Sequence, residues 1–487
     1  MIPESIKENK ELYSYALAVL LIAFATYFAN YYNPAAVFWD ENYHIASAQK
    51  YLEGVMYMEP HPPLGKLFIA LGEWILHPNA GLDLTYFTQT DYIKHFPKGY
   101  SWAGVRLFPA LFGTFSGLLF FLILYRISRH AELSFLFSSL YLFENGFILQ
   151  SRSAMLESTQ IFFIFATVLY FLVILDREKI GYRHYFGFGI LMGLSLMVKA
   201  NGLILILLYP ALFLYRVKWD HGRLKALWRF VVDGAVIVLG MAIVTVAVFY
   251  VHFALGQKLA KKHYSASSQY VKVIQEHETA NPANFPLMMK DNFRYMKNYS
   301  KGVPRYNPCK KGENGSLAVT WPFINKTINY RWSKKDGKVS YLYLMGNPVI
   351  WFSVVLAVIV ATALMLAHFV FGLQIADRRL FFLIGTFLTI YYSYMITMFN
   401  IERVMYLYHY FIPLFTGTFV LFTLFVYLFK PSIESGSRLL MFAVTLFAAE
   451  IVLTYWFFGP FTYYKPLSTM EFLQRQWFDF WKLKPVL

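Results

Sequence analysis

Acidic and basic side chains gather in a few short strings of an otherwise apolar chain, and the first string holds two adjacent carboxylates. In the string WDENYH at 39–44, Asp40 and Glu41 could provide a general base that removes a proton from a hydroxyl group. The pair could instead start a helix, with Asp40 as its N-cap and Glu41 in the first turn, where the helix dipole favours negative charge.

The second string, HPPLGK at 61–66, precedes an apolar run. Its prolines restrict the backbone, and Pro63 suits the first turn of a helix. Lys66 would then lie near a helix N-terminus beside the membrane, where an anion such as a phosphate group binds favourably. The alternative is an interfacial helix whose lysine extends to the lipid headgroups.

A third group consists of ionisable residues that would lie at membrane depth or at its edge, where charge is costly and indicates function. Its members are Arg106, Glu144, Arg152, Glu157 and Lys199. Because both signs of charge are present, these residues could also form salt bridges that hold helices together.

The fourth string is ERVMYLYHYFIP at 402–413. Arg403 and His409 could neutralise a phosphate group. Tyr406 and the other tyrosines would be ordinary members of an aromatic belt at the membrane surface.

The elements that must position these residues are apolar helices. Of the 487 residues, 57% are hydrophobic and only 15% are charged, which excludes a disordered chain and an ordinary cytosolic enzyme. A helix needs about 20 apolar residues to cross a bilayer. Eleven segments approach this length: 12–30, 103–125, 132–149, 156–175, 185–199, 201–216, 230–253, 347–370, 380–398, 408–429 and 439–458. We therefore predict an all-α polytopic membrane protein, in which 185–199 and 201–216 could also be one bent helix.

Lysines and arginines in alternate short loops predict the orientation, because such loops face the cytoplasm. The N-terminus would lie inside, and the long segments 31–101 and 254–346 would lie outside. The chain then divides into an N-terminal membrane half (1–253, with the outer loop 31–101), a large outer loop (254–346), C-terminal membrane helices (347–458) and an outer tail (459–487). Within the large loop, the stretch 296–340 is expected to be irregular, since it is rich in Gly, Asn, Lys and Ser. The net charge of +16 is weak evidence for nucleic-acid binding in such a protein.

Taken together and in order, from about residue 36 to 415, these strings resemble the protein O-mannosyltransferase family of the GT-C class. The similar features are the Asp-Glu pair, HPPLGK, the arginine at 106, the QSR string leading to an acidic residue at 150–157, VKANG at 198–202, GNP at 346–348 and LYHYF at 407–411. Glu157 departs from the family pattern, which has Asp there. The segment 254–346 is too short for the β-trefoil module of eukaryotic members, so the chain looks like the compact prokaryotic form.

The resemblance implies a bundle of about eleven transmembrane helices in the plasma (inner) membrane with an extracytoplasmic active site. It implies transfer of mannose from a polyprenyl (dolichyl) phosphate to Ser or Thr of a secreted protein, by a single inverting displacement. The implied roles are Asp40 as general base, with Glu41 orienting it or contacting substrate. The expected phosphate ligands are Lys66, Arg106, Arg403, His409, Arg152 and Lys199, and the expected sugar or acceptor ligands are Glu157, His61, Glu144 and Tyr406.

We expect no cofactor, since the lipid-linked sugar is a substrate. A metal site is also not expected, although Asp40, Glu41 and Glu157 could in principle hold a divalent ion. Three alternatives stay open: a related transferase of the aminoarabinose type with a lipid or glycan acceptor, a transporter of lipid-linked sugars, and a scaffold without activity. The molecule that gains the sugar distinguishes the first of these from a protein-modifying enzyme.

Overall fold

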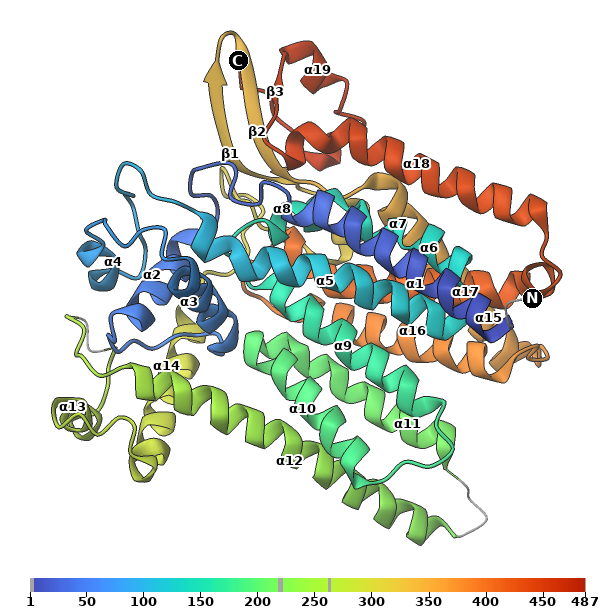
Figure 1. Cartoon of the computed structure of the whole chain (residues 1–487), viewed down its shortest axis with the longest axis horizontal. Coiled ribbons are helices and arrows are strands. Elements are labelled where there is room, and N and C mark those ends of the chain that lie inside the picture. Colours follow the sequence, from blue (N-terminus) through green and yellow to red (C-terminus); the bar gives the residue numbers. More distant parts are fainter. Residues whose placement is uncertain (1–3, 218–221, 262–263, 487) are drawn as a thin grey trace.

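The computed structural model describes residues 4–217, 222–261 and 264–486 and is a bundle of long helices capped at one end by smaller elements (Figure 1). Eight helical segments are long and apolar enough to cross a membrane. They are α1 (Glu4–Ala23) with its π-helical continuation η1 (Phe24–Phe28), α5 (Ala103–Ser128), α9 (Glu157–Leu175), α12 (Arg223–Leu255), α15 (Pro348–Phe371), α16 (Arg378–Phe399), η6 (Leu407–Tyr410) with α17 (Phe411–Glu434), and α18 (Arg438–Thr462). The chain is thus an integral, multi-pass membrane protein.

The other three predicted spans are helical but shorter or broken. The segment 132–149 is not one helix, because it divides into α6 (Ala131–Phe137), α7 (Ser139–Leu142) and α8 (Asn145–Ser151), and the carboxylate of Glu144 caps α8 by accepting from the Phe147 N–H. The segments 185–199 and 201–216 correspond to α10 (Tyr182–Val198) and to η2 (Ala200–Leu207) with α11 (Leu208–Arg216). The total of eleven spans therefore stays a prediction.

The segments around Lys199 do not form one bent helix. Lys199 has extended backbone angles (φ −149°, ψ 141°), and η2 then doubles back along α10 (Figure 1). Gly202 lies so close to α10 that an added Cβ would come within 2.8 Å of the Ser195 carbonyl oxygen. The turn places the Lys199 side chain at the end of α10 that faces the smaller elements.

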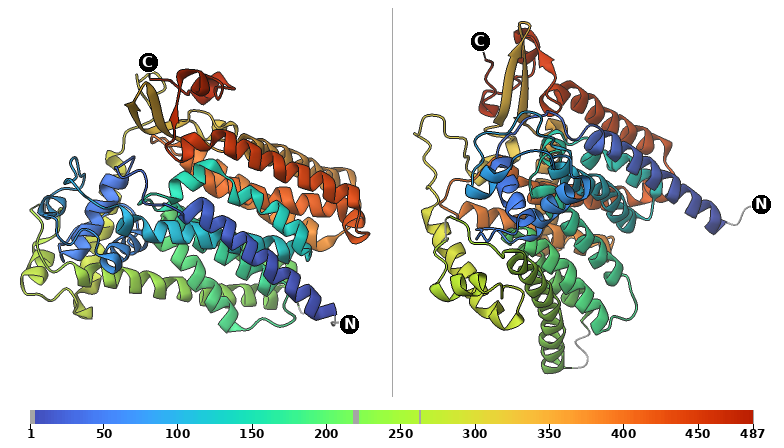
Figure 2. Two further views of the ribbon diagram at one scale, coloured as in Figure 1. Left: turned by 45° about the horizontal axis from the view of Figure 1, so that its top comes forward. Right: turned by 60° about the vertical axis from the view of Figure 1, so that its left-hand side comes forward.

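These smaller elements come from both long loops and from the C-terminal tail, and they gather at the end of the bundle opposite to the start of α1 (Figures 1 and 2). The segment 31–101 contributes α2 (Glu41–Leu52), α3 (Leu64–Leu76) and α4 (Thr85–Gln89). The segment 254–346 contributes α13 (Ser268–Gln275), η4 (Pro282–Asn284), α14 (Phe285–Gly302), η5 (Ala318–Phe323), β1 (Ile328–Lys335) and β2 (Lys338–Leu344). The tail contributes β3 (Pro466–Leu467), α19 (Thr469–Leu473) and η7 (Asp479–Trp481).

The expectation of an irregular chain throughout 296–340 is wrong at both ends, because α14 continues to Gly302 and the last part forms strands. Strands β1 and β2 form an antiparallel hairpin closed by Asp336 and Gly337, and β3 adds to β2. Both turn residues have positive φ (50° and 73°), as a tight two-residue hairpin turn requires. The Asp336-Gly337 pair, followed by the aromatic and aliphatic run at 341–344, was the hairpin signal that the composition of 296–340 concealed.

Helices α10 and α12 pack with their backbones in contact because glycines face each other. A Cβ at Gly189 would lie 2.1 Å from the Ile237 carbonyl oxygen, and one at Gly240 would lie 2.6 Å from that of Phe186. Small residues allow this close approach between membrane helices, where van der Waals contact replaces the hydrophobic effect.

This contact makes a stability prediction. Gly189→Ala should lower the free energy of unfolding by about 1–3 kcal/mol, since the added methyl group forces the helices apart. The measurement is thermal unfolding of the detergent-solubilised protein. Gly459→Ala is the matched control in α18, because an added Cβ there meets nothing within 4 Å. Equal melting temperatures for the two variants would contradict the prediction.

Candidate active site

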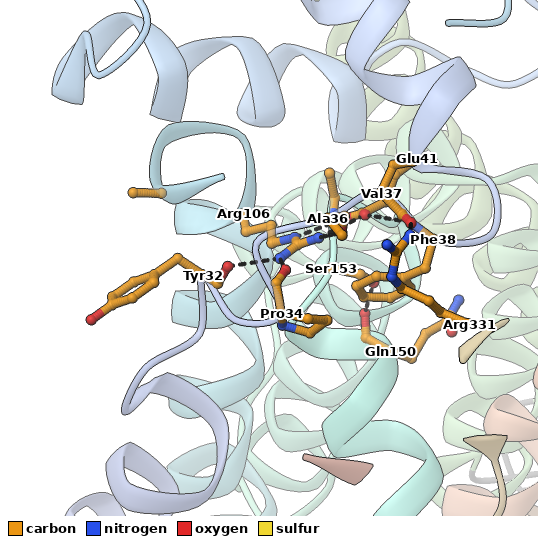
Figure 3. A network of polar contacts seen from close by, with 12 residues as sticks. Tyr32, Pro34, Ala36, Val37, Phe38, Glu41, Arg106, Gln150, Ser153 and Arg331 are labelled. Carbon is orange, nitrogen blue, oxygen red and sulfur yellow. Dashed lines mark hydrogen bonds and ion pairs between the residues drawn. The ribbon is translucent and has the colours of Figure 1, made fainter. Parts of the chain in front are cut away.

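A buried ion pair closes the chain segment between η1 and α2. Arg106 of α5 donates from Nε to Glu41 Oε1 (2.7 Å) and from Nη2 to Glu41 Oε2 (2.8 Å), and both side chains have no exposed surface (Figure 3). The remaining guanidinium bonds go to the carbonyl oxygens of Tyr32, Pro34 and Ala36, at 2.8–2.9 Å. This arrangement fixes residues 32–41 against the start of α5.

Glu41 and Arg106 therefore have no free hydrogen-bond acceptor or donor left for a substrate. The Glu41 carboxylate also accepts from the backbone N–H groups of Phe38 (3.1 Å) and Ala154 (2.8 Å). The geometry contradicts the expected roles of Arg106 as a phosphate ligand and of Glu41 as a substrate contact, because each is fully buried and fully hydrogen-bonded.

Arg152 and Glu144 are also structural in this arrangement. Arg152 donates to the carbonyl oxygens of Ala29 (2.8 Å) and Asn30 (2.7 Å), which follow the end of η1, and it stacks on the ring of Tyr463. Such a cation stabilises the negative end of a helix dipole. Glu144 accepts from the backbone N–H of Asn347 and from Trp351 Nε1, both at 2.9 Å, and so joins α8 to α15. Neither side chain faces the site that was predicted for it.

Asp40, unlike the four residues above, is not held by such structural hydrogen bonds among the described residues. The predicted helix start is confirmed, since α2 begins at Glu41 with Asp40 at its N-cap position, but the half-buried Asp40 side chain makes no capping hydrogen bond to the helix. Burial raises the pKa of Asp40 to about 6, with a further rise from the Glu157 carboxylate, while Lys199, Lys66 and a hydrogen bond from Tyr408 act against this shift. A carboxyl group with such a pKa suits a general base near neutral pH.

Two of the predicted cations beside Asp40 each have an acidic partner. Lys66, in the first turn of α3, is buried and forms an ion pair with Glu59, which also accepts from Ser47 Oγ at 2.5 Å. Burial lowers the pKa of Lys66, and Glu59 opposes that shift. Sequence analysis missed Glu59, although it lies two residues before the HPPLGK string.

The second pair, Lys199 with Glu157, lines a narrow pocket. Glu157 also accepts from Gln150 Nε2 (3.0 Å), and Gln150 Oε1 accepts from the Tyr330 hydroxyl (2.9 Å) of β1. The pocket is lined by Glu157, Gln160, Ile161, Lys199, Asn201, Tyr394, Tyr408, His409, Phe411 and Ile412. Polar groups of five distant chain segments thus meet here, and Glu157, Lys199 and Tyr408 among them act on Asp40.

Arg403 is the cation that stays available. It is half-buried, its Nε donates only to the sulfur of Met405 (3.4 Å), and it forms no ion pair within 4–217, 222–261 and 264–486. The pKa of His61 is lowered well below its usual range by burial and by the nearby charges of Lys199, Lys66 and Arg403. Arg403 and a neutral His61 therefore face the same region as Asp40.

Aromatic rings surround this region. Trp39 stacks on Tyr330 with ring centroids 4.9 Å apart and meets Tyr406 edge-on at 5.2 Å. The His409 ring stacks on Tyr408 at 4.6 Å, and its Nδ1 is engaged with the backbone of Tyr406. Sugar rings pack well against aromatic faces, which makes this enclosure suitable for a carbohydrate.

The structure thus brings together eight of the twelve predicted site residues. They are Asp40, Lys66, Arg403, His409, Lys199, Glu157, His61 and Tyr406. The residues that sequence analysis missed are Trp39, Glu59, Gln150, Tyr330 and Tyr408, and only Tyr330 had no neighbouring string to indicate it. In the part of the chain that the structure describes, no cluster of three or more His, Cys, Asp or Glu could hold a metal ion.

Solved structures with similar folds define the class of protein. The Saccharomyces cerevisiae protein O-mannosyltransferase Pmt1-Pmt2 complex bound to the sugar donor superposes with a TM-score of 0.78 at 14% identity, over 98% of this chain and 93% of that one. The Archaeoglobus fulgidus oligosaccharyltransferase AglB, in complex with an inhibitory peptide and a dolichol-phosphate, gives 0.51 at 12% identity, over 97% and 59%. The fold is that of the GT-C glycosyltransferases.

Sequence comparison gives the family. The model described as dolichyl-phosphate-mannose-protein mannosyltransferase matches residues 17–256, and the C-terminal four TMM region of protein-O-mannosyltransferase matches 294–481. Since the two matches together cover most of the chain, the protein belongs to the protein O-mannosyltransferase family.

Curated relatives are longer than the matched regions. Dolichyl-phosphate-mannose--protein mannosyltransferase 1 of Candida albicans is 30% identical over 50% of this chain and 28% of its own length. Protein O-mannosyl-transferase 1 of Danio rerio is 27% identical over 68% and 48%, and the polyprenol-phosphate-mannose--protein mannosyltransferase of Mycolicibacterium smegmatis is 22% identical over 60% and 58%. The chain therefore spans about a quarter to three fifths of the length of these relatives.

The buried ion pair makes a second prediction. Glu41→Ala should lower the free energy of unfolding by about 3–5 kcal/mol, because it leaves the Arg106 charge buried without a partner. Thermal unfolding in detergent measures this, with Glu53→Ala in the same chain segment as the exposed control. Equal melting temperatures of Glu41→Ala and Glu53→Ala would contradict the prediction.

Proposed function

We propose that the protein transfers mannose from a polyprenyl (dolichyl) phosphate to Ser or Thr hydroxyls of secreted polypeptides. The observation that carries this proposal is the half-buried Asp40 carboxylate, whose pKa burial raises to about 6 although Lys199 and Lys66 lie close enough to oppose the rise. Arg403 lies near His61 in the same region. Family membership supports the sugar and the acceptor, and the name of the mycobacterial relative supports the polyprenyl donor.

In the proposed reaction, Asp40 takes the proton of the acceptor hydroxyl as its oxygen attacks the anomeric carbon of mannose. The new bond from carbon to the acceptor oxygen forms while the bond to the phosphate oxygen breaks, and the polyprenyl phosphate leaves with the electron pair. A single displacement of this kind inverts the configuration of the sugar. General-base help of this type contributes about 10²–10⁴-fold to the rate.

The leaving phosphate gains negative charge, so it needs fixed positive groups. Glu59 and Glu157 neutralise Lys66 and Lys199, so Arg403 is the cation without an ion pair among the described residues of the site. Preorganised cations in a partly dehydrated site stabilise such a charge without rearrangement. We assign the phosphate to Arg403, with Lys66, Lys199 and His409 in support, and the sugar to Glu157, His61 and Tyr406.

These groups provide both the base and the phosphate ligands, so the proposed reaction uses no cofactor or metal ion. We further propose the plasma membrane as the location, with a cytoplasmic N-terminus and an extracytoplasmic site. The gathering of α2–α4, α13, α14 and the β-hairpin at one end of the bundle supports a site at one membrane face (Figure 2).

The direct test incubates the purified protein with polyprenyl-phosphate-mannose and a Ser/Thr peptide, and mass spectrometry identifies the product. The wild type should add one hexose to the peptide. Asp40→Asn should lower kcat by about 10²–10⁴-fold, since it removes the base. For the wild type, kcat/KM should fall as the pH drops below about 6, because Asp40 must lose its proton to act.

Asp83→Asn is the control, an exposed carboxylate of the same outer segment, and it should keep full activity. Near-normal turnover of correctly folded Asp40→Asn would remove Asp40 from the role of base. A sugar found on lipid, with none on peptide, would replace the proposed acceptor.

Arg403 has a matched neighbour for a second test. Arg403→Gln should raise the KM for the donor by roughly tenfold or more, as expected when a charged hydrogen bond to phosphate is lost. Arg305 pairs with residue 403 in an isolated β-bridge and is exposed, so Arg305→Gln is the control. Donor kinetics that respond equally to both substitutions would contradict the assignment.

A further inference from the structure

Strand β1 has an open edge beside the candidate active site. The sheet order is β1-β2-β3, so β1 pairs with only one strand. The hairpin projects from the bundle, and residues 332–335 of β1 are exposed (Figure 1). An unpaired edge presents a row of backbone N–H and C=O groups that can bind another extended chain.

The hairpin register shows which backbone groups are open. Lys335 and Lys338 flank the two-residue turn and form a hydrogen-bonded pair, as the turn type requires. The pairs of an antiparallel ladder alternate, so the N–H and C=O groups of Trp332 and Lys334 point away from β2. Among the described residues, these groups form no backbone–backbone hydrogen bond outside the strand ladder.

The start of β1 is fixed to the site itself. Tyr330 stacks on Trp39, the residue before Asp40, and its hydroxyl donates to Gln150. Arg331 donates to the Val37 carbonyl oxygen at 3.2 Å (Figure 3). The open edge therefore begins about 7 Å further along the strand, given a rise of about 3.3 Å per residue.

We propose that the acceptor polypeptide binds as an added strand on this edge, through the backbone groups of Trp332 and Lys334. This inference rests on the proposed function, because it needs a polypeptide acceptor. Backbone pairing accepts many sequences, which suits an enzyme that needs only a hydroxyl group in an extended segment. The hydroxyl that reaches Asp40 then lies about two to four residues from the paired positions.

The side chains of β1 favour binding of another polypeptide at this edge over mere protection of the edge from aggregation. Lysines commonly protect edge strands, and Lys334 and Lys335 stand next to the turn. Trp332, however, exposes 51% of its surface, which a protected edge avoids. An exposed indole between the lysines and the site offers an apolar contact to a bound chain.

The test separates the backbone from the side chain of one residue. Trp332→Pro removes the outward N–H group and blocks the edge, yet it leaves the β1–β2 ladder intact because that N–H is not part of it. Trp332→Thr is the matched control, since it removes the indole and keeps the N–H group. We expect Trp332→Pro to raise the KM for the peptide by about tenfold more than Trp332→Thr does, with the donor KM unchanged.

A second measurement alters the peptide. Two N-methylated acceptor peptides are compared, one with methyl groups on the odd backbone nitrogens and one with them on the even nitrogens. Only the peptide whose methylated nitrogens face β1 should have a raised KM, because alternate N–H groups of a strand pair with its neighbour. Equal peptide KM values for Trp332→Pro and Trp332→Thr, with no effect of N-methylation, would overturn the proposal while transfer itself persists. If Trp332→Pro changes the mass of the protein particle in detergent but not the KM for the peptide, the edge is an interface between copies of the chain. That result would also overturn the proposal. No transfer to any peptide would instead contradict the proposed function.

Discussion

The buried pair of Glu41 and Arg106 determines where Asp40, the proposed base, lies. Two charges without solvent contact are stable only when every hydrogen-bonding position is satisfied, and here the guanidinium bonds the carboxylate and three carbonyl oxygens of one short segment. This requirement pulls residues 32–41 onto α5. Asp40 comes next to Glu41, so its half-buried position follows from a contact that takes no part in the chemistry.

The cations around Asp40 are of two kinds: lysines that are paired with a carboxylate, and an arginine that has no such partner among the described residues. Lys66 and Lys199 are held by Glu59 and Glu157, which keeps the cations fixed and reduces the cost of burying them. Arg403 remains without an ion pair among the described residues. A site of this kind is nearly neutral before the donor binds and has one positive group ready for the phosphate, which is the preorganisation that charge-separating reactions need.

The segment 254–346 is part of the site and not a separate module. Tyr330 of β1 reaches Gln150 across 180 residues of sequence and stacks on Trp39, while Arg331 holds the segment before Asp40. The hairpin therefore links the end of the bundle where the smaller elements gather to the proposed base. The proposed binding of the acceptor at the β1 edge uses this connection.

The apolar segments, the Asp-Glu pair and the strings around Lys66, Glu157 and Arg403 were readable from the sequence, because span length and local motifs are properties of neighbouring residues. They were sufficient for the helical membrane fold and the family. The sequence could not distinguish cations that face the site from cations that only hold the bundle. Arg106 meets Glu41 across 65 residues, and Arg152 meets the backbone of Ala29 across 123. Only the tertiary structure decides such pairings, since the free energy of a buried charge depends on partners that no local pattern contains.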